Sequence, residues 1–170
     1  MTERRSALNK EFKVGDVAVY PAHGVGEVQS IETREIAGNK HKFYILKILD
    51  SGMTIMVPTG NVRNVGLREV INESETDIVY DILRERDISI NEQTWNRRYR
   101  EYMDKIKTGS IYEIAEVMRD LMLLRYEKEL SFGERKMLDT ARYLIVKELA
   151  ISQDMAEDEI SDEIDEIFVN

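Results

Sequence analysis

The sequence predicts an α+β protein in which a small β-barrel precedes an all-helical domain of about five helices. Through residue 71, short apolar runs recur about every ten residues between turn residues, which is typical of a small barrel. From residue 74 onward, apolar residues recur at helical spacing behind capping motifs. We therefore expect domains at residues 12–71 and 72–153, with a flexible leader at 1–11 and an acidic tail at 154–170.

Turn chemistry separates four expected strands in the first domain. Glycine and asparagine tolerate positive φ, so Ala37–Lys40 is predicted to form a hairpin turn. In the run before it, strand alternation places Val28 and Ser30 on one side of the sheet. Pro58 ends the fourth strand or marks it as a sheet edge. The expected strands span residues 17–20, 25–31, 42–49 and 53–57.

Three capping motifs indicate helix starts in the second domain, at Ser74-x-x-Asp77, Ser110-x-x-Glu113 and Ser131-x-x-Glu134. Each motif precedes apolar residues that share one helical face. Thr94 is a suitable N-cap for another helix that begins at Trp95, and Gly109 ends that helix.

The composition favours a cytoplasmic protein. The 170 residues contain no cysteine, which excludes disulfides and thiolate metal sites and suits a reducing compartment. No apolar run approaches the roughly 20 residues that a membrane span requires. The first ten residues are polar and lack the apolar centre of a secretion signal.

The net charge of −9 is concentrated at the end of the chain. Eight acidic and no basic residues lie between Asp154 and Asn170, which leaves 25 acids against 24 bases in residues 1–153. The body can therefore carry a basic patch. The acidic segment contains an amphipathic stretch from about Ala156 to Phe168, and its simplest role is a solvated end. Alternatively, it screens the basic patch against non-specific DNA.

No pattern of catalytic or metal-ligating residues is present. His23 and His41 lie in or beside expected turns without a cluster of other ligands. Gly24-Val25-Gly26 is better explained as a turn than as a nucleotide loop, because no helix follows it. We expect no enzyme activity, no cofactor and no metal.

The segment Trp95–Lys107 holds the only tryptophan of the chain, together with five basic and two acidic residues. Aromatic residues among arginines suggest contact with nucleic acid. However, Trp95, Tyr99, Tyr102 and Ile106 also form one helical stripe, which favours a buried core face. Trp95 lies in the first turn, where it can project past the packed face, so the pattern leaves both interpretations open.

A second basic cluster, Arg135-Lys136, lies in the first turn of the next long helix. Helix N-termini present unpaired N–H groups and therefore bind phosphates well. The alternative is a solvated first turn, which is the more common situation for lysine and arginine.

Four segments resemble the CarD/CdnL family of bacterial transcription regulators: Phe12–Asp16, Val19–Gly26, Trp95–Arg100 and Leu130–Leu138. The resemblance covers residues 12–153 and both domains in order. The N-terminal domain is also similar to the polymerase-binding domain of transcription-repair coupling factors, although the chain contains no helicase.

The resemblance implies a Tudor-like first domain that binds the β1 lobe of the RNA polymerase β subunit, where an edge strand extends the partner's sheet. The implied polymerase-binding positions are Arg34, Met56, Val57 and Pro58. Some members carry a basic residue where this chain has Met56, so an apolar contact is expected there.

The resemblance further implies that the helical domain contacts promoter DNA at the upstream edge of the −10 region and thereby stabilises the open complex. Trp95 would be a wedge in the minor groove, without sequence-specific reading of bases. The implied phosphate contacts are Arg97, Arg98, Arg100, Arg135 and Lys136. The protein would be a monomer that joins the nucleoid through polymerase. The alternative function is a protein-interaction adaptor whose helical domain docks another regulator without touching DNA.

Overall fold

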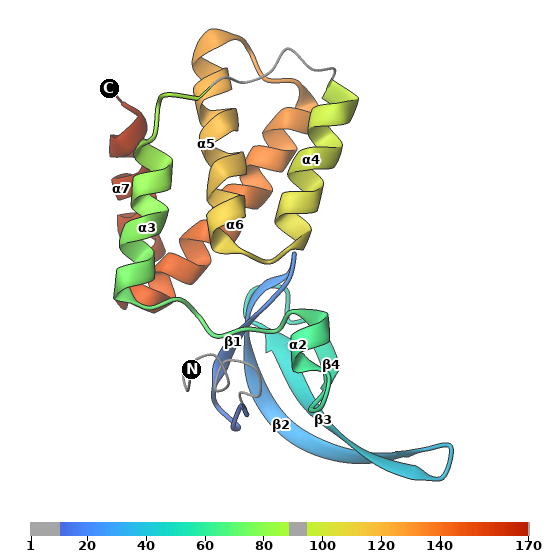
Figure 1. Ribbon diagram of the computed structural model, residues 1–170. Helices are drawn as coiled ribbons and strands as arrows, with labels where there is room; N and C mark the ends of the chain where they lie inside the picture. Colours follow the sequence, from blue (N-terminus) through green and yellow to red (C-terminus); the bar gives the residue numbers. More distant parts are fainter. Residues whose placement is uncertain (1–10, 89–94, 170) are drawn as a thin grey trace, which may run out of the picture. The chain divides into compact units, whose positions relative to one another are not determined.

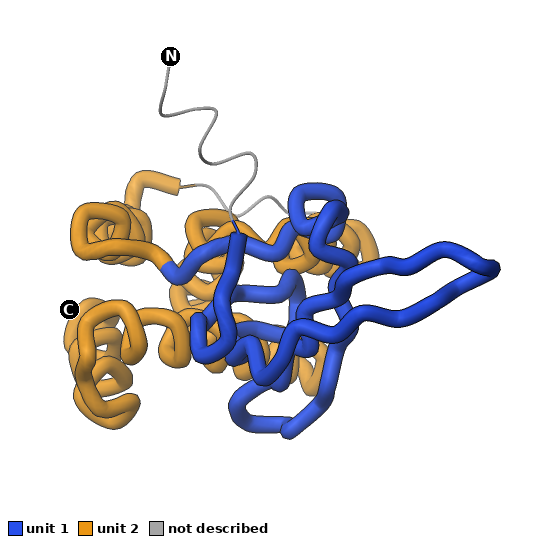
Figure 2. The backbone as a smooth tube through the Cα atoms, turned by 90° about the horizontal axis from the view of Figure 1, so that it is seen from below, with its two compact units in different colours: residues 1–70 blue, residues 71–170 orange. Residues whose placement is uncertain are grey.

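The computed structural model describes residues 11–88 and 95–169, and the chain divides into two compact units, Met1–Val70 and Ile71–Asn170 (Figures 1 and 2). The first unit contains strands and the second contains helices, which confirms the predicted α+β class. The bounds in the first unit are β1 Val17–Tyr20, β2 Gly24–Ile36, β3 Asn39–Ile48, β4 Thr54–Pro58 and α2 Val62–Val65. Those in the second are α3 Glu73–Arg84, α4 Trp95–Lys107, α5 Ile111–Glu127, α6 Phe132–Gln153 and α7 Glu157–Phe168.

The four strands form one antiparallel sheet in the order β1-β2-β3-β4. The long strands β2 and β3 bend strongly (Figure 1), which lets one face of the sheet enclose a core. The β1 edge is covered, because the N–H and C=O of Val19 bond Arg68 at 2.8 and 3.1 Å. The core residues of this unit are Phe12, Ala18, Val28, Tyr44, Leu46, Ile48, Val57 and Leu67.

The predicted hairpin turn is confirmed between β2 and β3. Ile36 pairs with Asn39, so the turn has two residues, Ala37 and Gly38, with φ of 51° and 82°. Two successive positive φ values match the right-handed twist of the flanking strands. Residues 33–42 are exposed, and the hairpin projects from its unit (Figure 2).

The expected alternation of Val28 and Ser30 on one face is wrong, because β2 contains a bulge. Val28 pairs with Leu46, whereas Ser30 pairs with Ile45, so Gln29 is an extra residue without an opposite partner. A bulge of one residue moves every following side chain to the other face. From Ser30 onward, the even-numbered residues of β2 therefore face away from the core.

The helical unit is built around α5 and α6, which pack on each other (Figure 1). Helices α3 and α4 pack on α5, while α7 packs on α3 and α6. The Ser131–Glu134 capping box is confirmed, whereas Ser110 precedes α5 without a side-chain capping bond. Gly109 has φ of 74° at the end of α4, as expected, and Thr94 lies outside the described residues.

The first helix of this unit begins earlier than the sequence pattern predicted. Its N-cap is Asn72, whose side chain accepts from the N–H of Glu75 at 2.9 Å, and Glu75 completes the capping box. The motif at Ser74–Asp77 lies two residues too late. Asparagine is at least as good an N-cap as serine, and the apolar stripe does not distinguish the two registers.

The acidic segment expected to be a solvated tail contributes helix α7 to the core of this unit. Ile160, Ile164 and Phe168 are buried there. Glu159, Asp162 and Glu166 are exposed, whereas Glu163 bonds Tyr80 of α3 and Asp165 pairs with Arg142 of α6. Ile167 is partly buried and packs against the same core. Within residues 11–88 and 95–169, no helix is long and apolar enough to cross a membrane.

Candidate functional site

The two basic helix starts singled out from the sequence lie side by side. A Cβ built at Gly133, the second residue of α6, would lie 3.3 Å from Cζ2 of Trp95, the first residue of α4. A side chain at position 133 would therefore crowd the indole. The arrangement brings the starts of α4 and α6 to the same end of the helical unit (Figure 1).

Trp95 is half-buried, so one part of its side chain belongs to the core and another part is accessible for a contact with nucleic acid. Its ring packs against the edge of the helical core and meets the Tyr99 ring edge-on, with 5.6 Å between centroids. Tyr102 and Ile106 are buried, as the core interpretation predicts, but Tyr99 is exposed. The buried part of the stripe anchors α4, and its first turn stays accessible.

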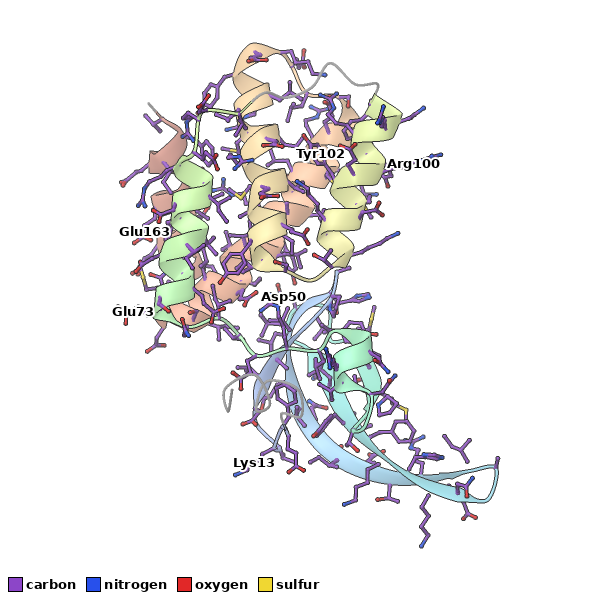
Figure 3. All side chains as sticks on the ribbon, viewed as in Figure 1. Lys13, Asp50, Glu73, Arg100, Tyr102 and Glu163 are labelled. Atoms are coloured by element: carbon purple, nitrogen blue, oxygen red, sulfur yellow. The ribbon has the colours of Figure 1, made fainter. Side chains whose placement is uncertain are left out.

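Arg97 and Arg100 are exposed on α4, the helix that begins at Trp95. The Arg97 side chain is 72% exposed and has only a loose contact of 3.9 Å with Glu101. Exposed pairs of this kind contribute little to stability, so the guanidinium is available to an incoming anion. Arg100 points away from the helical unit (Figure 3).

Arg98 differs from its two neighbours, because its side chain is only 13% exposed. Its Nη2 lies 3.6 Å from Oε2 of Glu134, and its guanidinium carbon lies 5.7 Å from the Trp95 ring. An arginine enclosed in this way has little surface left for a phosphate. The structure therefore differs from the expectation that all three arginines present their charge to DNA.

The N-terminus of α6 is occupied by its own carboxylate. Glu134 Oε1 accepts from the N–H of Ser131 at 2.9 Å and from Lys128 Nζ at 2.8 Å. Burial pushes the pKa of the Glu134 carboxyl upward, but the hydrogen bonds from Lys128 and Ser131 outweigh it and leave this pKa below its usual value. A buried anion at this helix start competes with phosphate binding by the backbone. The exposed side chains of Arg135 and Lys136 remain the cationic groups of this turn.

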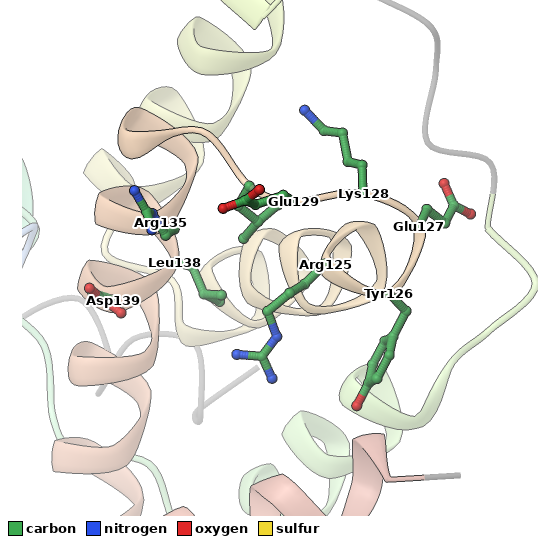
Figure 4. Close-up of a pocket in the computed structure, with 9 residues that line it drawn as sticks. Arg125, Tyr126, Glu127, Lys128, Glu129, Arg135, Leu138 and Asp139 are labelled. Atoms are coloured by element: carbon green, nitrogen blue, oxygen red, sulfur yellow. The ribbon is translucent and has the colours of Figure 1, made fainter.

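Arg135 also lines an open pocket of about 490 Å³ between α5 and α6 (Figure 4). Arg125 and Lys128 contribute further positive charge to its wall, and Glu129 and Asp139 contribute negative charge. The sequence interpretation missed Arg125 and also Phe132, which is 75% exposed next to Gly133. Phe132 directly follows the N-cap residue of α6 and lies before the apolar stripe that begins at Met137. This position in the sequence could have indicated that its side chain is exposed.

Polar contacts link α5 to the residue after α3 and to α4. Arg119 pairs with Asp120 at 3.1 Å and with Glu85, after the end of α3, at 3.0 Å. Burial raises the pKa of the Asp120 carboxyl, and burial together with Asp120 raises the pKa of the Tyr102 hydroxyl. Tyr102 is labelled on α4 in Figure 3, and its interaction with Asp120 of α5 makes the contact between these helices polar as well as apolar.

In the first unit, β4 is the uncovered edge of the sheet. Thr59 donates its N–H to Lys42, and Met53 accepts from Ile48, so the odd-numbered residues turn their main-chain groups toward β3. Main-chain groups alternate between the two sides of a strand, so those of Thr54 and Met56 point to the outer edge. Among the described residues, no strand pairs there.

Three of the four expected polymerase-binding side chains share the face opposite the core. Met56 pairs with Ile45, and Pro58 with Phe43, on this face. The bulge at Gln29 brings Arg34 to the same face, where it pairs with His41 and bonds Glu32 at 3.0 Å. The fourth residue, Val57, faces the core and is 1% exposed. Only its main chain can take part in a contact.

Family comparison gives two matches that together span most of the chain. Residues 12–71 match the CarD-like/TRCF RID domain, which implies interaction with RNA polymerase, and residues 78–165 match the CarD C-terminal domain. The chain is also similar to YdeB, a candidate transcription factor of Bacillus subtilis strain 168. The two are 37% identical over 149 residues, which cover 88% of this chain and 97% of that protein.

Two solved structures from Myxococcus xanthus are similar to part of the chain. CdnLNt is 56% identical, covers 38% of this chain and 90% of its own, and has a TM-score of 0.32. The 72-residue N-terminal domain of CarD is 39% identical, covers 35% of this chain and 79% of its own, and has a TM-score of 0.31.

The domain order and the family matches define a transcription regulator built from a RID-type sheet domain and a helical domain. The chain belongs to the CarD family.

Proposed function

We propose that this protein binds the β1 lobe of the RNA polymerase β subunit through its sheet unit and stabilises the open promoter complex through its helical unit. In this proposal Trp95 enters the minor groove at the upstream edge of the −10 region. The observation that carries the proposal is the position of Trp95. Its half-buried indole lies at the joined starts of α4 and α6, with exposed arginines on both helices.

The charges around the indole support a contact with the DNA backbone. Arg97 and Arg100 are exposed on α4, and Arg135 and Lys136 are exposed on α6, so each of the two helices whose starts meet at Trp95 carries two exposed cationic groups. Phosphate contacts fix the position of a protein on DNA but carry no sequence information. Base selection would therefore come from polymerase and its σ factor.

The uncovered β4 edge supports the polymerase contact. The outward N–H and C=O of Met56 can extend a partner sheet by one strand, and its exposed side chain adds an apolar contact. Arg34 on the same face supplies a charge for recognition.

The wedge explains how binding would favour the open complex. Inserting an apolar side chain at a base step costs a few kcal/mol of unstacking, and this cost is least where the strands already separate. A protein that binds the melted junction better than closed duplex shifts the equilibrium toward the open state.

A promoter-melting assay with purified polymerase, with and without the protein, tests this function. The proposal predicts more open complex at equilibrium when the protein is added. Salt dependence separates it from the adaptor function. Contacts with several phosphates make log affinity fall by about 0.9 per phosphate for each unit of log salt, whereas docking of another regulator in an apolar groove is far less sensitive.

A further inference from the structure

Arg98, Glu134 and Trp95 form a buried contact that neither stability nor phosphate binding explains. Nε of Arg98 and Oε2 of Glu134 are buried and have no hydrogen-bond partner among the described residues, and the ion pair between the two side chains is long at 3.6 Å. A buried ion pair contributes little net stability even when its hydrogen bonds are complete. This pair leaves one polar atom unsatisfied on each side.

The contact covers part of the half-buried indole of Trp95. The Arg98 guanidinium lies 5.7 Å from the centre of the indole, and the backbone of Gly133 approaches it closely. The Tyr99 ring closes a further side. Glu134 in turn is held by Lys128 and by the backbone of Ser131, so the carboxylate that faces Arg98 has a fixed position.

We propose that Arg98 is a positioning residue for Trp95 and not a phosphate contact, and that Glu134 holds Arg98 in place. The proposal rests on the proposed function of Trp95 as the DNA wedge. A guanidinium over an aromatic ring restricts the rotation of that ring. Arg98 also faces Oε2 of Glu134, and if it turned outward it would leave this buried oxygen without a cationic partner, because Lys128 and Ser131 bond the other oxygen. Trp95 is thereby held in one orientation before DNA arrives, which lowers the entropic cost of binding.

Lysine and glutamine substitutions at Arg98 and at its neighbour Arg97 separate positioning from phosphate binding. A phosphate contact tolerates lysine as a point charge, whereas an aromatic contact that needs a planar guanidinium does not. Arg97 is the matched control, because it is adjacent, has the same side chain and is exposed. The variants are Arg98→Lys, Arg98→Gln, Arg97→Lys and Arg97→Gln in the full chain.

Binding to a polymerase–promoter open complex is measured over a range of salt concentrations. Arg97→Gln is expected to reduce the slope of log affinity against log salt by about 0.9, while Arg97→Lys retains the slope. Both Arg98 variants are expected to weaken binding about 3- to 30-fold with the slope unchanged. If Arg98→Gln reduced the slope of log affinity against log salt and Arg98→Lys retained the wild-type slope, Arg98 would be a phosphate contact and the proposal would be overturned.

The fluorescence of the free protein gives a second readout that does not depend on DNA. Trp95 is the only tryptophan, so the emission spectrum and its quenching by acrylamide belong to this residue alone. Arg98→Lys and Glu134→Gln are expected to increase quenching, while Arg97→Lys leaves it unchanged. Unchanged quenching in both would show that the pair does not hold the indole.

Circular dichroism checks that each variant retains its helices, and Trp95→Ala is included in the binding series. If Trp95→Ala binds like wild type, the proposed function fails. If Trp95→Ala loses binding but the Arg98 variants behave like the Arg97 variants, only the positioning role fails.

Discussion

Met56 and Val57 are neighbours in β4 whose side chains face opposite sides of the sheet, so changes at the two positions are expected to affect different properties. Met56 is 41% exposed beside the uncovered edge, so Met56→Glu is expected to weaken polymerase binding and leave the melting temperature nearly unchanged. Val57→Ala removes buried methyl groups and is expected to cost about 2 kcal/mol of unfolding free energy. Binding to isolated polymerase measures the effect of Met56→Glu, and chemical denaturation measures the effect of Val57→Ala.

Met53→Glu is the matched control for Met56→Glu, because Met53 is similarly exposed but lies before the start of β4. Equal loss of polymerase binding in both variants would mean that added negative charge, and not the strand edge, is responsible.

Glu134 predicts how the stability of the helical unit changes with pH. Its pKa in the folded protein lies below the usual value of 4.5, because the hydrogen bonds from Lys128 and Ser131 outweigh the effect of burial. A lowered folded-state pKa gives stability that is complete above about pH 4.5 and is lost as the pH falls through the folded pKa. The advantage of wild type over Glu134→Gln in urea denaturation should therefore be greatest near neutral pH and shrink below pH 4.5. An advantage that grows with acid would contradict this assignment.

The residue roles could be predicted from sequence only in part. Trp95 was recognisable as a candidate because it is unique and lies among arginines. The different positions of Arg97 and Arg98 could not be predicted, because both follow the tryptophan in the same helical turn. Their difference arises from Glu134, which is 36 residues away from Arg98 in the sequence and meets it only when α4 and α6 pack together.

At the scale of elements, helix α7 is separated from the basic face of α4. Helix α4 packs on α5, and α7 packs on α3 and α6 at the other side of the helical unit (Figure 1). Packed helices lie 8–10 Å apart, so two helix spacings exceed the screening length of about 8 Å at physiological salt. Screening of the α4 patch by α7 is therefore weak.

Neutralising the exposed face of α7 tests this conclusion. The triple variant Glu159→Gln, Asp162→Asn, Glu166→Gln is expected to change affinity for random duplex less than about twofold at physiological salt. Arg100→Gln serves as the comparison that lowers affinity. Affinity for random duplex is measured by fluorescence anisotropy. A several-fold higher affinity of the triple variant would show that α7 does screen the basic residues of α4. Deleting residues 154–170 is unsuitable, because it removes three buried side chains and exposes the core.

The elements themselves were largely predictable, and the failures have local causes. Periodicity and Gly109 located α4, and the capping box located α6, because these signals lie within one or two turns of the chain. The bulge at Gln29 has no such signal. It arises from the pairing of β2 with β3, and it decides that Arg34 shares a face with Met56.

At the scale of the whole molecule, the net charge of the chain and its proposed attachment to polymerase together bear on its affinity for DNA. Residues 1–153 are nearly neutral overall, so long-range attraction to DNA is small. Binding to polymerase through the sheet unit would raise the effective DNA concentration at the helical unit. Under the proposed function the two units would therefore depend on each other, although each has its own core.

This dependence predicts that the isolated helical unit, residues 71–170, binds promoter DNA only weakly and does not stabilise the open complex. The isolated sheet unit, residues 1–70, should bind polymerase and compete with the full chain. Competition with labelled full-length protein measures polymerase binding by residues 1–70. The lifetime of the open complex measures the effect of residues 71–170. Stabilisation of the open complex by residues 71–170 alone at micromolar concentration would contradict the tethering.

The lifetime of the open promoter complex after challenge with a competitor is the most direct measurement of the central claim. Wild-type protein should lengthen this lifetime. Trp95→Ala should bind polymerase normally and retain its helices, yet shorten the lifetime toward that of polymerase alone. A Trp95→Ala protein that folds, binds polymerase and still lengthens the lifetime as wild type does would show that the tryptophan is not the wedge.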